Sequence, residues 1–108
     1  WALANQGHAA EAIAEYEQAR RLQPDFASAE FKWGLTLAMN NRVLDAVPHF
    51  TRAVDLQPED PDMRYVLGGA LFEVGRRTDA IAQFEETLRL DPNHAGARQA
   101  LESIQHSR

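Results

Sequence analysis

The segment Arg20-Arg21-Leu22-Gln23-Pro24-Asp25 recurs, in two close variants, farther along the chain. It returns as Asp55-Leu56-Gln57-Pro58-Glu59 and as Arg89-Leu90-Asp91-Pro92-Asn93, so that each leucine and each proline follows its predecessor by 34 residues. A fixed period of this length indicates a repeat architecture, in which one supersecondary unit stacks on the next. The repeat therefore decides the fold.

Further positions match at the same period. The matching sets are Ala12, Ala46 and Ala80; Tyr16, Phe50 and Phe84; Ala19, Ala53 and Thr87; and Gly34 with Gly68. Gly7, Asn41 and Gly75 also coincide, and glycine and asparagine are the residues that best tolerate a left-handed backbone. We expect a turn at these three positions, and so many matches across three copies exclude coincidence.

Between these markers the apolar residues recur at helical spacing, and no segment alternates like a half-buried strand. The pattern predicts two helix pairs, Ala27–Asn40 with Val43–Leu56 and Pro61–Val74 with Arg77–Leu90. Asp60 before Pro61 is typical of a helix start, because the carboxylate caps free N–H groups and proline at the first position loses no hydrogen bond. The proline after each second helix ends it, because proline lacks the N–H and clashes with the preceding turn.

This arrangement resembles the tetratricopeptide repeat (TPR) family, whose 34-residue motif contains a Leu-Gly pair, Ala-x3-Phe, a further alanine and a closing proline. The second unit supplies Trp33-Gly34, Leu37, Ala46-x3-Phe50, Ala53 and Pro58, and the third supplies Leu67-Gly68, Leu71, Ala80-x3-Phe84, Thr87 and Pro92. The resemblance implies an all-α fold, an α-solenoid of antiparallel helix pairs in a right-handed superhelix. About three repeats and a C-terminal capping helix are expected.

Three departures from the motif are visible. Glu30 and Arg64 stand where the family often has tryptophan, which is a variable site, and Thr87 replaces a small residue. Pro48 lies inside a predicted helix, where an interior proline can cost about 3 kcal/mol. We expect it to be tolerated near the helix start, with a kink.

We expect a single TPR domain over residues 1–108, with a truncated first repeat (1–26), a second repeat (27–60), a third repeat (61–94) and a capping helix (95–108). The cap follows from an apolar stripe on an otherwise polar segment, formed by Ala97, Ala100, Leu101 and Ile104. Counted back from Pro24, the first unit lacks its opening residues. We therefore expect the C-terminal portion of a longer repeat protein, whose uncovered N-terminal end could pair with another copy.

The composition excludes several classes of function. The net charge of −5 and the scattered basic residues argue against nucleic acid. The absence of cysteine excludes disulfides, thiolate metal sites and a cysteine nucleophile. No apolar run approaches the roughly 18 residues of a membrane span, so we expect no direct membrane insertion. The compartment stays open, with the cytoplasm slightly favoured over the periplasm, and Lys32 as the sole lysine hints at a GC-rich bacterial genome.

No catalytic, metal or cofactor site is expected. The four histidines lack metal-ligand spacing on any one helix, and we place them at solvated or edge positions: His8, His49, His94 and His106. No serine lies in a nucleophile-elbow motif, and Gly68-Gly69 lacks the lysine of a phosphate loop. We therefore predict that the chain is not an enzyme.

In the TPR family the first helix of each unit lines a concave groove, and this resemblance implies the candidate site. The residues carried over are Phe31, Lys32, Leu35, Met39, Asp62, Tyr65, Val66, Gly69, Phe72 and Glu73. Most of them are apolar or aromatic, which suits a peptide or a partner helix. Some of them, Leu35 and Phe72 above all, could instead serve only helix packing.

The leading hypothesis is a protein–protein interaction module that binds an apolar segment in this groove. One alternative is a structural spacer or self-association element, and another is a localising or regulatory domain of an enzyme fused upstream. The basic clamp with which some TPR domains grip acidic chaperone tails is not matched. Its positions correspond here to Trp1, Lys32, Asp62 and Val66, of which only Lys32 is basic.

Overall fold

The computed structural model describes residues 11–15, 17–18 and 27–106, and every regular element in these ranges is a helix. The helices are α2 (Ala27–Met39), α3 (Val43–Leu56), α4 (Pro61–Glu73), α5 (Arg77–Leu90) and α6 (Ala95–His106). Residues 11–15 and 17–18 are also helical. No helix in the described part of the chain is long and apolar enough to cross a membrane.

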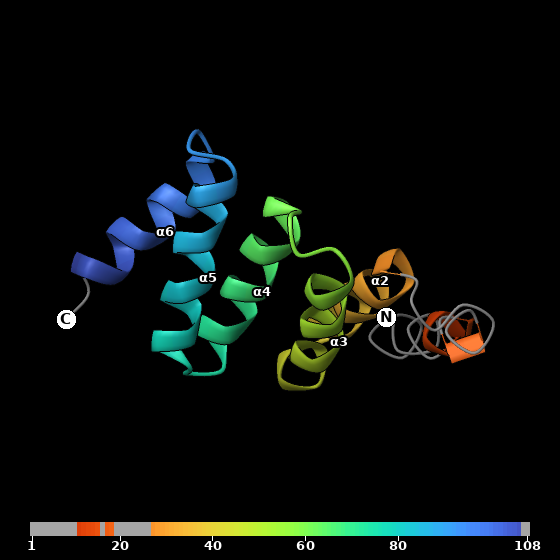
Figure 1. Ribbon diagram of the computed structural model, residues 1–108. Coiled ribbons are helices and arrows are strands. Elements are labelled where there is room, and N and C mark those ends of the chain that lie inside the picture. Colours follow the sequence, from red (N-terminus) through yellow and green to blue (C-terminus); the bar gives the residue numbers. More distant parts are fainter. Residues whose placement is uncertain (1–10, 16, 19–26, 107–108) are drawn as a thin grey trace.

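The helices form a row in which each one packs on its neighbour (Figure 1). The two most extensive contacts are those of α2 with α3 and of α4 with α5, which are the two helix pairs predicted from the period. The pairs meet through α3 and α4, and α6 packs on α5. The predicted all-α helical repeat is therefore confirmed.

The helix ends follow the local sequence closely. The Oδ1 atom of Asp60 accepts hydrogen bonds from the backbone N–H groups of Asp62 and Met63, at 3.0 and 3.1 Å. The predicted start at Asp60-Pro61 is thus confirmed. In the turn after each first helix, Asn41 and Gly75 have φ values of 62° and 86°. The expected left-handed turn is present at both positions, and Gly7 lies outside the described residues.

Pro48 lies in the early turns of α3 and is exposed to solvent. The helix continues through it to Leu56, as predicted. A proline near a helix start costs less than a central one, because fewer hydrogen bonds of the helix precede it.

Within each pair, a phenylalanine of the second helix packs against a glycine of the first. A Cβ atom built on Gly34 would lie 2.6 Å from Cε1 of Phe50, and one built on Gly68 would lie 2.7 Å from Cε1 of Phe84. Both rings are buried. Only glycine permits this approach, so the repeated glycine and aromatic columns are two halves of one contact.

The joints between units also repeat. Nε of Arg64 donates a hydrogen bond to the carbonyl oxygen of Pro58 at 2.8 Å, and Nη2 of Arg98 donates to that of Pro92 at 2.8 Å. Both the two arginines and the two prolines are separated by 34 residues. The arginine near the start of α4 and of α6 therefore holds the closing proline of the preceding unit.

The last helix covers the end of the third unit as predicted. Ala97 and Ile104 are buried, and Ala100 and Leu101 pack against the same hydrophobic core. The guanidinium of Arg77, at the start of α5, donates a hydrogen bond to the carbonyl oxygen of Ile104. The helix α6 is thus held near both of its ends.

Candidate functional site

A pocket of about 500 Å³ opens between α4 and α6. Its volume falls within the range of roughly 300–1,000 Å³ that is usual for ligand pockets. The lining residues are Tyr65, Val66, Gly69, Phe72 and Glu73 from α4, Phe84 from α5, and Ala100, Ser103 and Ile104 from α6. Most of this lining is apolar, and 44% of the surface of Phe72 is exposed. The pocket is therefore suited to an apolar ligand group.

Aromatic contacts fix the wall formed by α4. The ring of Tyr65 lies 5.8 Å from that of Phe84, at an angle of 49°. One period earlier, the rings of Phe31 and Phe50 lie 5.6 Å apart at 54°. A Cβ atom built on Gly96 would lie 2.8 Å from Cζ of Tyr65, so the absence of a side chain there admits the tyrosine ring beside α6. These ring contacts hold the α4 wall of the pocket in place, in addition to the hydrogen bonds of the helix backbone.

Gly69 differs from these packed glycines. A Cβ atom built on it would meet nothing within 4 Å, although the residue lies inside α4. Glycine in a helix interior costs about 1 kcal/mol relative to alanine. At Gly69 no contact within the described fold requires a glycine. The missing side chain leaves bare backbone in the pocket wall.

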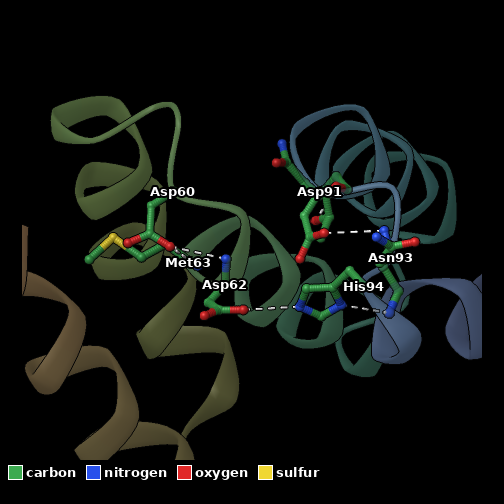
Figure 2. Close-up of polar contacts among 9 residues, drawn as sticks. Asp60, Asp62, Met63, Asp91, Asn93 and His94 are labelled. Carbon is green, nitrogen blue, oxygen red and sulfur yellow. Dashed lines mark hydrogen bonds and ion pairs between the residues drawn. The ribbon is translucent and has the colours of Figure 1, made fainter.

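His94 joins the two helices that form the pocket (Figure 2). Its Nδ1 atom accepts a hydrogen bond from the backbone N–H of Ala97 at 3.1 Å. A neutral imidazole in this role carries its proton on Nε2, which lies 3.0 Å from Oδ1 of Asp62. The ring of His94 also contacts that of Tyr65, with centroids 4.8 Å apart. His94 thus caps α6 as Asp60 caps α4, and it ties α6 back to the start of α4.

Residues 1–61 and 31–95 match the family model described as tetratricopeptide repeat. The chain belongs to the tetratricopeptide repeat family. The resemblance inferred from the motif is therefore confirmed. Repeats of the TPR family are in general interaction modules and not enzymes, so membership marks the chain as a protein-interaction module. Comparison with curated protein sequences gives no significant match.

Solved TPR structures share the fold. The first TPR of Spaghetti (RPAP3), bound to the HSP90 peptide SRMEEVD, is 23% identical with a TM-score of 0.83, over 93% of this chain and 79% of that one. MamA is 23% identical with a TM-score of 0.85, over 92% of this chain and 58% of that one. TTC0263, a TPR protein of Thermus thermophilus, is 24% identical with a TM-score of 0.79, over 93% and 51%. The chain thus spans little more than half of the last two proteins.

The structure brings half of the ten predicted TPR site residues together. Tyr65, Val66, Gly69, Phe72 and Glu73 line the pocket. The other five lie outside its lining: Phe31 and Leu35 are half-buried against the core, Lys32 and Met39 are exposed on α2, and Asp62 is exposed at the start of α4. Phe72 lines the pocket, whereas Leu35 packs on the hydrophobic core.

Four lining residues were absent from the predicted set. Phe84 belongs to the repeated aromatic column of the motif, and Ala100, Ser103 and Ile104 belong to the helix expected only as a cap. The 34-residue period could have identified two of these lining residues, because Ala100 and Ser103 follow Val66 and Gly69 by 34 residues. The capping helix therefore takes the place of the first helix of a further unit.

The pocket lining carries a single negative charge. Glu73 is the one charged residue among those that line it. Asp62 lies at the start of α4 with 83% of its side chain exposed. The nearest basic position of the predicted groove is Lys32, on the neighbouring pair. An anionic ligand in the α4–α6 pocket would therefore meet the carboxylate of Glu73.

A second polar cluster lies between α2 and α3. The carboxylate of Glu30, which is 1% exposed, lies 3.0 Å from Nδ1 of His49 and 3.3 Å from Nε of Arg52. The His49 ring stacks on Trp33, with centroids 3.9 Å apart. Of the histidines placed at solvated or edge positions, His49 and His94 are largely buried and hydrogen-bonded.

This cluster is a structural feature of the first pair. One period later the same positions hold Arg64 and Gln83, whose Nη1 and Oε1 atoms lie 3.1 Å apart. No group of three or more potential metal ligands occurs in the described ranges. The variable position of the motif thus carries a helix-to-helix contact of different charge in each unit.

Proposed function

We propose that the chain binds a short apolar segment of a partner protein along the first helices of its repeats, with the α4–α6 pocket as the deepest part of the site. The exposed ring of Phe72 at the mouth of an apolar pocket carries the proposal. A concave, mostly apolar pocket is the usual form of a site that binds an apolar ligand group.

The groove is proposed to continue along α2. Residues one period before the pocket wall are Phe31, Lys32, Leu35 and Met39, which correspond to Tyr65, Val66, Gly69 and Glu73. Met39 is 81% exposed, and a flexible thioether adapts to different ligand shapes. Asp62 would complete the site at the opposite end of α4.

The segment is proposed to be other than an acidic chaperone tail. Of the clamp positions inferred from the resemblance, Asp62 is an exposed carboxylate and Val66 lines the apolar pocket. A carboxylate ligand would be repelled by Asp62 and would gain no hydrogen bond from Val66. The peptide held by the RPAP3 domain is therefore not proposed for this chain.

The test is to select ligands from a random dodecapeptide library displayed on phage and to map an enriched peptide by NMR. We expect amide shifts in α4 and α6 and loss of binding in Phe72→Glu. Leu44→Glu is the matched control, because Leu44 is also an exposed apolar residue, 71% exposed, but lies on α3. Shifts confined to other helices, or equal loss in both variants, would refute the proposal.

A further inference from the structure

From the pocket wall we infer the chemistry of the partner, an inference that rests on the proposed function. We propose that the partner places a bulky aliphatic or aromatic side chain against the bare backbone at Gly69 and a lysine or arginine close by, within reach of Glu73. Gly69 and Glu73 would then be the two residues that determine specificity.

Gly69 differs from the other glycines within helices in what surrounds it. Gly34, Gly68 and Gly96 each face an aromatic ring at less than 3 Å from a built Cβ atom, so packing explains all three. Gly69 faces open space. A residue that weakens its helix without serving a contact in the described fold is best explained by a ligand that needs the room.

The internal repeat supplies a comparison for this position. One period earlier it is occupied by Leu35, which is half-buried against the core. A leucine side chain is therefore compatible with a first helix of this chain at that point. Glycine in the third unit opens the site where Phe72, Phe84 and Ile104 provide an apolar surface for an anchor side chain.

The pocket lining also carries one charged side chain. Glu73 follows Gly69 by one helical turn and lines the same pocket. Among the described residues Glu73 forms no ion pair, and no basic side chain lines the pocket. The pocket is therefore complementary to a segment that carries a positive charge near Glu73.

The same dodecapeptide library tests the inference with two variants. Peptides enriched on the unaltered chain should share a large apolar residue with a lysine or arginine close to it. Gly69→Leu should weaken the binding of a synthetic peptide from this set by roughly thirtyfold, because it fills the anchor site. Glu73→Gln should weaken it by roughly two- to fivefold and reduce its dependence on salt.

Controls separate binding from folding. Gly69→Leu should raise the thermal midpoint by a few degrees, since leucine is the better helix former, so its loss of binding cannot result from unfolding. Glu85→Gln removes an exposed carboxylate on α5 that does not line the pocket, and it should leave the basic preference of the peptides intact. Calorimetry with the synthetic peptide gives the affinities.

The possible outcomes distinguish failure of this inference from failure of the proposed function. Peptides that bind at α4 and α6 but are insensitive to Gly69→Leu, or that are enriched in acidic residues, overturn this inference and leave the proposed function standing. If no peptide is enriched, or if the peptides bind elsewhere on the chain, both are overturned. Loss of binding in Gly69→Leu together with loss of the basic preference in Glu73→Gln supports both.

Discussion

The Nε2 atom of His94 lies 3.0 Å from the Oδ1 atom of Asp62, so that the residue before α6 is bonded to the start of α4. The same ring accepts a hydrogen bond from the N–H of Ala97 and contacts Tyr65 in the pocket wall. One side chain therefore caps the last helix and sets its position against the helix on the other side of the pocket.

Replacing His94 should loosen α6 selectively. His94→Ala removes the cap, the bond to Asp62 and the contact with Tyr65, and we expect a loss of about 1–2 kcal/mol in the free energy of unfolding. His94→Asn retains a capping oxygen and should lose less. Urea denaturation measures the free energy of unfolding of each variant. Amide hydrogen exchange should increase first at Ala97 and Arg98. Equal stability of both variants and the unaltered chain would show that the cap contributes nothing.

Two adjacent glycines should respond in opposite ways to the same substitution. Gly68→Ala places a Cβ atom 2.7 Å from Cε1 of Phe84 and should destabilise the chain by about 1–3 kcal/mol through overpacking. Gly69→Ala meets open space and should stabilise it by roughly 0.5–1 kcal/mol through helix propensity. Thermal or urea denaturation of the pair is the measurement. The packing account fails if both variants shift in the same direction.

The cluster of Glu30, His49 and Arg52 has a counterpart of opposite charge one period later, at Arg64, Gln83 and Glu86. Glu30→Arg alone should cost about 3–5 kcal/mol, because it removes a buried pairing and faces Arg52 with a like charge. The triple variant Glu30→Arg, His49→Gln, Arg52→Glu copies the second arrangement and should recover at least half of that loss. Urea denaturation of the single and triple variants tests this, and no recovery would mean that the two clusters are not interchangeable.

The exposed pair of Glu86 and Arg89 predicts a pH effect. The hydrogen bond from Arg89 holds the pKa of the Glu86 carboxyl below its ordinary value, and the charges of Arg89 and Arg64 act in the same direction. Because the pKa is lowered by folding, the stabilisation is present above the pKa of the unfolded chain and is lost as the pH falls through the folded value. An NMR titration of the carboxyl carbon should show the lowered pKa, and Arg89→Gln should raise it. An unchanged pKa in that variant would exclude Arg89 as the cause.

The helix boundaries were predictable because residues next to them in the sequence determine them. Both second helices occupy the predicted ranges, Val43–Leu56 and Arg77–Leu90, since proline and the turn residues delimit them. The first helices end one residue earlier than predicted, at Met39 and Glu73, because the next residue already belongs to the turn that leads to Asn41 or Gly75.

The pocket was only half predictable, because its second wall depends on tertiary packing. The spacing of α4 identified one side, from Tyr65 to Glu73. The other side requires that α6 pack as a further first helix, and the apolar stripe that predicted a cap does not reveal this. The partners of His94 were equally hidden, since Asp62 lies 32 residues away in the chain.

The repeated bonds of Arg64 to Pro58 and of Arg98 to Pro92 have a consequence for how such a chain can grow. A duplicate of residues 61–94 inserted after His94 would present a matching arginine and a matching proline at each new junction. The array could then be lengthened in whole units without any new kind of joint. Each added unit would bring its own glycine at the position of Gly69, and with it another place for a partner to anchor.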